Sequence, residues 1–421
     1  MKRIFLISAI LLLPITGTRA VINPFKPYKP LNEIDYSLNW SLGKDPTSIA
    51  YRPESLTTRS LLPIGMIVTS ALYNDYAHDM RIRKQGSLIS PPMQSADILQ
   101  YSPVAIMTAI KLAGVQGRSD WPRMLTADMM ACALTVSVTR LGKNTFGRER
   151  PDGSTRNSYP SGHTATAFMC AQMLHKEYGE TVSPWISVGG YTIASTAGVF
   201  RVIANRHWCS DVICGAAIGI LATELSYDLT DVLFGEYGLR KPIVVADLDD
   251  DIRWRFSLRS SNSMESDVFT GSGYGNPNAK PACSIGVQGT RVFGYIGATL
   301  YAGLTQLKWT GQDDAFLPDR GSVTDVHTLA AGLDVQIPVI KRISLNGQAL
   351  AGYSPTTNSY RFIYRNQPLE WEIPEGLHCY ANLGMTLRTS SFSSITVHGG
   401  LDYYDKVWRS FAMGANFNFI F

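Results

Sequence analysis

The spacing of apolar residues changes once along the chain, and this change restricts the fold more than any other feature. From about residue 61 to 236 the apolar residues form long segments with helical character, whereas after about residue 250 they alternate with polar residues. A chain of 421 residues is also too long for one typical domain. We therefore expect two domains: an all-α helix bundle over residues 61–245 and an antiparallel β-domain over residues 250–421.

The composition excludes several classes of protein. Hydrophobic residues make up 45% of the chain and charged residues 17%, which does not fit a disordered, collagen-like or coiled-coil protein. The formal net charge is +4, with the basic residues dispersed, so no nucleic-acid partner is expected.

The N-terminus resembles an export signal. Lys2 and Arg3 precede an apolar run over residues 4–15, and the small residues Thr18 and Ala20 follow it. Residues 1–20 are therefore predicted to be a signal peptide, with an uncleaved membrane anchor as the alternative. Residues 21–60 contain several prolines and are predicted to form an irregular leader. Export would place the six cysteines in an oxidising compartment, but their spacing leaves their pairing open.

Six segments carry the helical pattern in the first domain. They cover residues 61–76, 101–117, 124–141, 163–178, 184–204 and 211–234. Lys111, Asp128, Arg140 and Glu224 interrupt three of them, and a charge within a membrane span is costly. We therefore expect no clean membrane span, and a bundle that is soluble or only peripherally associated with lipid.

The second domain contains eight candidate strands. They lie near residues 252–260, 282–290, 295–308, 326–337, 342–353, 377–387, 394–404 and 411–421. Long loops alternate with short turns between them, as in an outer-membrane barrel. The final strand, which ends in Asn416-Phe417-Asn418-Phe419-Ile420-Phe421, resembles the C-terminal signal of bacterial outer-membrane barrels. A soluble barrel or sandwich is the alternative.

The barrel prediction has consequences for location. An even number of strands returns both ends of the barrel to the side of the short turns, which is normally periplasmic. The helical domain is therefore expected in the periplasm, joined to the outer membrane by a barrel that the barrel-assembly machinery would insert. An eight-stranded barrel is mostly filled by side chains, so transport through it is not expected.

Three segments of the helical half combine cationic and phosphate-binding residues. The first begins at Lys143 and ends at Arg150 and Pro151, and two cations at a helix end suit an anion. The second, Pro160-Ser161-Gly162-His163, opens a helix, whose free N–H groups and dipole also favour an anion. Taken singly, a solvated charged helix end and a serine N-cap beside an incidental histidine are the simpler explanations.

The third segment, Arg201 to Asp211, contains a possible nucleophile. His207 and Asp211 are four residues apart, which on a helix places both side chains on one face. The carboxylate could keep one ring nitrogen protonated and leave the other as a nucleophile. A surface His/Asp pair is the simpler explanation of this segment alone.

Taken in order, the three segments resemble the signature motifs of the type 2 phosphatidic acid phosphatase (PAP2) superfamily, which includes acid phosphatases, lipid phosphatases and vanadium haloperoxidases. The motifs are Lys-x6-Arg-Pro, Pro-Ser-Gly-His and Arg-x5-His-x3-Asp. The third motif usually has serine before its arginine, where this chain has Phe200. This departure removes one hydroxyl that could contact phosphate and leaves the nucleophile in place.

The resemblance implies a role for each motif residue. His207 would attack phosphorus and form a phosphohistidine, Asp211 would orient His207, and His163 would protonate the leaving oxygen. The phosphate oxygens would be bound by a further set of groups: Lys143, Arg150, Ser161, Gly162 and Arg201. With three cationic side chains in these roles, neither a metal nor another cofactor is expected.

Together these observations predict a metal-independent phosphatase acting on a phosphorylated membrane lipid. Lipid A is the first choice because of the inferred membrane, and phosphatidylglycerol phosphate, phosphatidate and undecaprenyl pyrophosphate also fit. A vanadium haloperoxidase is one rival, because vanadate uses the same cationic site and histidine. The other rival is a non-enzymatic adhesin or structural barrel whose helical half only binds phosphate.

Overall fold

The computed structural model describes the chain from residue 55 to 420 with gaps. The described ranges are 55–77, 97–204, 206–235, 254–264, 279–309, 317–318, 325–340, 342–355, 360–364, 367–371, 375–390, 392–405 and 408–420. The predicted signal peptide and most of the predicted leader lie outside these ranges, as do residues 236–253 around the predicted domain boundary. Those boundaries stay predictions.

The helices of the first domain follow the predicted segments closely. They are α2 (Leu56–Ala77), α4 (Ser102–Leu112), α5 (Trp121–Phe146), α6 (Gly162–Leu174), α7 (Pro184–Ile203) and α8 (Cys209–Phe234), with a π-helical turn, η2 (His175–Gly179), after α6. Helix α2 starts within the segment predicted to be an irregular leader, so that prediction was wrong for residues 56–60. The all-α class of this domain is confirmed.

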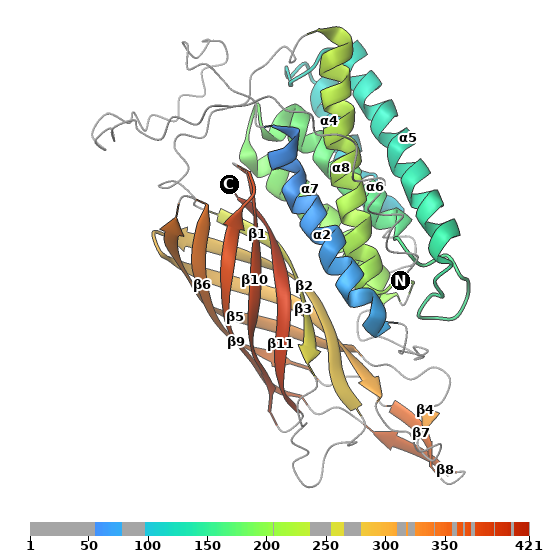
Figure 1. The fold of residues 1–421 in the computed structure, drawn as a ribbon, viewed down its shortest axis with the longest axis vertical. Coiled ribbons are helices and arrows are strands. Elements are labelled where there is room, and N and C mark those ends of the chain that lie inside the picture. The colour runs from blue at the N-terminus through green and yellow to red at the C-terminus, as the bar shows by residue number, and fades with distance from the viewer. Residues whose placement is uncertain are drawn as a thin grey trace. The chain divides into compact units, whose positions relative to one another are not determined.

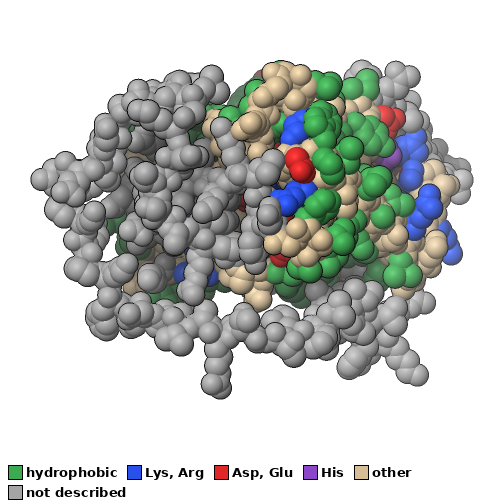
Figure 2. Space-filling model, turned by 90° about the horizontal axis from the view of Figure 1, so that it is seen from above, with side chains coloured by type: hydrophobic (Ala, Val, Ile, Leu, Met, Phe, Trp, Pro, Cys, Tyr) green, Lys and Arg blue, Asp and Glu red, His purple; other side chains and the backbone are tan. Residues whose placement is uncertain are grey.

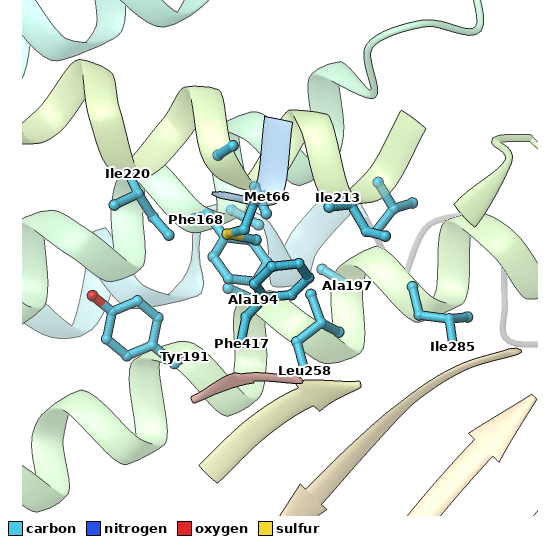
Figure 3. Packing of buried hydrophobic residues seen from close by; sticks show 14 of the residues in the cluster. Met66, Phe168, Tyr191, Ala194, Ala197, Ile213, Ile220, Leu258, Ile285 and Phe417 are labelled. Carbon is cyan, nitrogen blue, oxygen red and sulfur yellow. The ribbon is translucent and has the colours of Figure 1, made fainter. Parts of the chain in front are cut away.

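Helix α8 is the centre of the helical domain. Helices α2, α5 and α6 all pack against it (Figure 1), and most of its residues are buried. Figure 3 shows part of the core, where Met66, Phe168 and Ile213 come from three different helices and are almost completely buried. Burying apolar side chains from several helices is the main force that holds such a bundle together.

Two glycines bring α6 and α8 into backbone contact. A Cβ atom on Gly215 would lie 2.5 Å from the carbonyl oxygen of Ser161, and one on Gly219 would lie 2.3 Å from that of Ala165. Only glycine allows so close an approach. The start of α6 is therefore held directly against the first turns of α8.

The expectation of no clean membrane span was wrong as far as length and composition go. Helices α5, α7 and α8 are each long and apolar enough to do so by length and composition. Two of the interrupting charges face other parts of the bundle: Asp128 lies 3.4 Å from the Tyr227 hydroxyl, and buried Glu224 pairs with Lys176 at 2.9 Å. Charges paired inside the bundle do not have to enter lipid.

The second domain is a closed antiparallel barrel of eight strands, as predicted (Figure 1). The strands are β1 (Trp254–Met264), β2 (Ala279–Phe293), β3 (Ile296–Trp309), β5 (Asp325–Ile340), β6 (Ile343–Ser354), β9 (Gly376–Arg388), β10 (Ser393–Tyr404) and β11 (Trp408–Ile420). Strands β1 and β11 close the barrel, with Arg255 opposite Ile420. The first and last strands therefore begin and end on the side of the short turns, as expected.

The inner and outer faces of the barrel wall differ in polarity. Along β6 the side chains of Asn346 and Gln348 are buried, whereas Leu345 is exposed. The interior contains charged side chains with partners, such as the pair Arg255 and Asp334. Polar-in and apolar-out alternation is the pattern of a barrel surrounded by lipid. The long loops also contain a small sheet that the sequence did not predict: β4 (Leu317–Pro318), β7 (Tyr360–Tyr364) and β8 (Gln367–Trp371).

Candidate active site

The three motif segments meet where four helices begin or end. Lys143 lies in the last turn of α5 and Ser161 caps α6, while Arg201 lies in the last turn of α7. His207 lies just before α8 and Asp211 in its first turn. The glycine contact between α6 and α8 explains this convergence, since it lets the Ser161 amide donate to the Asp211 carbonyl oxygen at 3.0 Å.

The imidazole of His207 is held by the backbone as well as by Asp211. The Nδ1 atom lies 2.8 Å from the carbonyl oxygen of Ser158, to which it donates a hydrogen bond, whereas the distance from Nδ1 to Asp211 Oδ2 is 3.6 Å. A proton fixed on Nδ1 leaves Nε2 with its lone pair, which is the form a nucleophile needs. Asp211 therefore shares with a backbone carbonyl the orienting role predicted for it alone.

Burial keeps His207 neutral. It lowers the pKa of His207 to about 4, and although nearby Asp211 raises it, Arg201 and Lys143 lower it further. A neutral imidazole at physiological pH can attack an electrophile without first losing a proton.

The carboxylate of Asp211 is completely buried and has three donors. Oδ1 accepts a hydrogen bond from Arg148 Nη1 at 2.8 Å, and Oδ2 accepts from the Trp208 amide at 2.8 Å and from the Ser158 hydroxyl. Arg148 also donates to the Ser210 hydroxyl at 2.7 Å. Hydrogen bonds to both oxygens, together with the ion pair between Arg148 and Oδ1, fix the orientation of the carboxylate.

The predicted cations surround the same region. Lys143 interacts electrostatically with both Arg150 and Arg201, and its Nζ donates to the Asn157 carbonyl at 2.7 Å. The buried Nε atoms of Arg150 and Arg201 have no hydrogen-bond partner among the described residues. Cations that repel one another and have unused hydrogen-bond donors favour the binding of an anion between them.

His163 is linked to the same cations from the start of α6. Burial lowers the pKa of His163, as do Arg201 and Lys143, while a contact with Asp97 opposes the shift. The ring Nε2 lies 2.7 Å from Asp97 Oδ1. Both imidazoles are therefore influenced by Arg201 and Lys143.

Ser161 and Gly162 form the N-terminal end of α6. The Ser161 hydroxyl is buried and accepts a hydrogen bond from the Thr164 amide at 3.5 Å, as a capping residue does, and it also contacts the Thr164 hydroxyl at 2.9 Å. A Cβ on Gly162 would lie 3.6 Å from Thr139 and 3.8 Å from the Lys143 side chain, which is ordinary contact. Gly162 is therefore not required for packing against protein atoms, and it lies beside Lys143.

Three residues of the site were missed from the sequence: Asp97, Arg148 and Ser158. Arg148 lies inside the first motif segment, but its spacing could not show that it bonds to Asp211. Ser158 contributes a carbonyl oxygen, which any residue type supplies. Asp97 lies before α4, far from every motif, and no sequence signal points to it.

No group of three or more His, Cys, Asp or Glu side chains suited to a metal ion occurs in the part of the chain that the structure describes. Two acidic residues near the site are paired with cations, Asp211 with Arg148 at 2.8 Å and Asp152 with Arg206 at 3.0 Å, and Asp97 contacts His163. The charges available to an incoming anion are therefore mainly positive.

Comparison with known proteins agrees with this geometry. Residues 125–233 match the PAP2 superfamily. This part of the chain is a PAP2 domain. The domain includes every predicted site residue from Lys143 to Asp211 and excludes Asp97, so the resemblance to this superfamily is confirmed.

A curated relative of the chain is the lipid A 1-phosphatase of Porphyromonas gingivalis. It is 43% identical over 187 residues, which are 44% of this chain and 41% of the relative. The chain thus spans less than half the length of this relative.

Two solved structures each cover part of the chain. LpxE of Aquifex aeolicus covers 38% of this chain with 95% of its own length, at 22% identity and a TM-score of 0.27. Ail, the attachment invasion locus protein of Yersinia pestis, covers 40% of this chain with 100% of its own length, at 13% identity and a TM-score of 0.27.

Proposed function

We propose that the chain is a metal-independent phosphatase that hydrolyses a phosphate monoester or pyrophosphate of a membrane lipid, with lipid A as the first choice. The observation that carries the proposal is that the start of α6, which carries His163, bonds to Asp211 beside His207, with Lys143 and Arg201 influencing both imidazoles. Two histidines beside shared cations match the requirements of phosphoryl transfer, in which negative charge spreads over the phosphate oxygens. The choice of lipid A rests on the name of the curated relative and on the barrel.

In the first step His207 Nε2 attacks phosphorus, and the bond from phosphorus to the leaving oxygen breaks. The Nδ1 proton stays on the ring, held by the Ser158 carbonyl, and Asp211 stabilises the positive charge that develops there. Lys143, Arg150 and Arg201 bind the phosphate oxygens, with the backbone at Ser161 and Gly162.

His163 supplies the proton that the leaving alkoxide needs. Arg201 and Lys143 disfavour the charged form of His163, but a phosphate dianion between them would offset this repulsion. The substrate thus promotes protonation of its own acid catalyst. Water then attacks the phosphohistidine, His163 accepts a proton from this water, and inorganic phosphate leaves.

The location follows from the barrel. We place the barrel in the outer membrane of a Gram-negative bacterium, and the catalytic domain on its periplasmic side. A tether of this kind raises the local concentration of lipid headgroups around the site. The predicted signal peptide of residues 1–20 would provide the export step.

The test is phosphate release by the detergent-solubilised full chain from a panel of lipid A species and phospholipids. We expect release from at least one lipid, and its loss in His207→Ala. His175→Gln is a matched control, because His175 is also buried in the helical domain but contacts Ser187 at 2.8 Å instead of the motif residues. Release that survives His207→Ala would refute the proposed nucleophile.

The rival haloperoxidase activity requires the same site to hold vanadate. Purified protein supplied with vanadate, peroxide and a halide should not halogenate an indicator substrate if the phosphatase assignment is right. A protein that binds inorganic phosphate but releases none from any lipid would support the non-enzymatic alternative.

A further inference from the structure

The interior of the barrel contains a buried arginine that no carboxylate contacts. This residue, Arg259 on β1, has 1% of its surface exposed. The Lys and Arg side chains visible in Figure 2 lie at the surface, where water and dissolved ions screen their charge. A charge inside the barrel has no such screening, and burying it without a counter-charge is costly.

The contacts of Arg259 are with uncharged groups. Its Nη1 donates a hydrogen bond to Gln348 Oε1 at 2.7 Å. Its guanidinium carbon lies 4.9 Å from the centre of the Tyr380 ring and 5.3 Å from that of Tyr301. Aromatic rings and an amide oxygen stabilise a cation, but they do not neutralise it.

The buried acids of the barrel are bonded to other partners. Among the residues that the structure describes, these acids are Asp334 and Asp402. Asp334 forms an ion pair with Arg255, and Asp402 Oδ1 lies 2.6 Å from His378 Nε2. Neither acid therefore neutralises Arg259 by direct contact.

Several interior side chains around Arg259 have polar atoms without a hydrogen-bond partner among the described residues. They are Arg259 Nε, both ring nitrogens of His398, Gln288 Nε2, Asn382 Nδ2, the Tyr301 hydroxyl and Asn416 Oδ1. The strand register brings them together, because Asn416 lies opposite Arg259 and Gln288 lies opposite Tyr301. Asn382 lies opposite Gln348, the residue that bonds to Arg259. Apart from the Asn416 oxygen, each of these side chains offers a donor, and unused donors around a cation suit an anion.

The sequence beside His398 explains why its imidazole has no partner. The ring is buried, with 4% of the residue exposed, and it interacts electrostatically with Arg259. The residues opposite His398 on the two neighbouring strands are Gly414 on β11 and Gly384 on β9. Because glycine has no side chain, neither position can supply a hydrogen-bonding group to the ring. The imidazole thus stays available to a ligand.

We propose that the barrel interior binds a small monovalent anion, such as chloride, beside Arg259, with His398, Gln288, Asn382 and Tyr301 as hydrogen-bond donors. Water could satisfy these donors, but it would bring no charge to offset the arginine. The ligand must be small, because side chains fill most of the interior of an eight-stranded barrel.

The proposed anion would also stabilise the barrel. Its ligands come from five strands, β1, β2, β3, β9 and β10, so the anion would link strands on different sides of the wall. A ligand that binds only the folded state raises the stability of that state as its concentration increases. Chloride should therefore raise the unfolding temperature of the barrel, and an anion too large for the interior should not.

The test uses the full chain in a non-ionic detergent and a gluconate buffer, with chloride added at constant ionic strength. Binding is followed by the broadening of the ³⁵Cl magnetic resonance signal, and stability by the thermal midpoint of the β-sheet circular-dichroism signal. The variants are Arg259→Gln, which removes the cation, and His398→Leu, which removes a donor without changing the charge. The matched control is Arg255→Gln combined with Asp334→Asn, which removes an interior arginine together with its acid.

We expect Arg259→Gln to lose the broadening that the wild type shows, and His398→Leu to raise the chloride dissociation constant roughly tenfold. The control should keep the broadening. Each tenfold rise in chloride above the dissociation constant should raise the wild-type midpoint by about 3 °C, and gluconate should have no such effect.

Equal broadening by the wild type and by Arg259→Gln would overturn the proposal, because the interior would then hold only water. Loss of broadening in the control as well would also overturn it, since any change inside the barrel would then have the same effect. If Arg259→Gln fails to fold, the comparison of His398→Leu with the control decides. An unchanged dissociation constant in His398→Leu would count against the site.

Discussion

The contact between α6 and α8 leads to a sharp prediction for Gly219→Ala. A Cβ at this position would lie 2.3 Å from the Ala165 oxygen and 2.6 Å from the Met169 nitrogen. Both are backbone atoms, so no side chain can rotate away. To move the closest contact from 2.3 Å to the 3.0 Å below which real Cβ atoms are essentially never found, the helices must separate by about 0.7 Å.

This separation should affect catalysis more than stability. Overpacking costs about 1–3 kcal/mol, from which the better helix propensity of alanine recovers up to about 1 kcal/mol. The same shift moves Ser161 and His163 on α6 relative to Asp211 on α8. Because a displacement of about 1 Å can reduce a rate about 100-fold, we expect kcat to fall roughly 10-fold to 100-fold.

The assay is phosphate release from the lipid that the wild type hydrolyses best, together with thermal inactivation of the full chain in detergent. Gly189→Ala in α7 is the matched control, because a Cβ there meets no atom within 4 Å. It gains the same helix propensity and should keep wild-type kcat. If Gly219→Ala also kept wild-type kcat, the idea that glycine contact aligns the two halves of the site would be refuted.

Four further outcomes follow from the site. Arg148→Met leaves the buried carboxylate of Asp211 without its cation, which should cost about 3–5 kcal/mol and lower the melting temperature of the helical circular-dichroism signal; an unchanged melt would count against the pair. His207 must be neutral to attack, and its pKa is about 4, so protonation of His207 should lower kcat/KM only below about pH 4. A fall in kcat/KM near pH 6.5 that is traced to His207 would contradict the burial of this residue. Asp97 raises the pKa of His163, so Asp97→Asn should move the basic limb of the kcat/KM profile to lower pH, whereas a shift to higher pH would show that the contact acts otherwise. Dialysis against a metal chelator should leave turnover unchanged, and recovery of a lost activity by added divalent metal would refute the metal-independent mechanism.

The architecture could be predicted from the sequence because it depends on local pattern. A helix and a strand repeat their apolar residues at different intervals, so the change near residue 250 distinguished the helical part of the chain from the barrel, and the later pattern located all eight barrel strands. The small sheet of β4, β7 and β8 was missed because these strands are short, and β4 has only two residues.

The motifs also showed which residue types the site contains, because phosphate chemistry needs histidines and cations at defined spacings. Only the tertiary structure decided how each side chain is used. Arg148 and Arg150 are two residues apart, yet only Arg148 bonds to Asp211. The partner of His207 Nδ1 is a backbone carbonyl, which every residue type has, so the sequence could not identify it.

The same limit applies to the charges that suggested a soluble bundle. In the sequence, Asp128 interrupts an apolar run, whereas in the fold it faces Tyr227 and leaves the opposite side of α5 apolar. Residue spacing determines which residues share a helix face, but which face is covered depends on the other helices that pack there. That choice depends on contacts between segments far apart in the chain, such as Gly219 against Ala165.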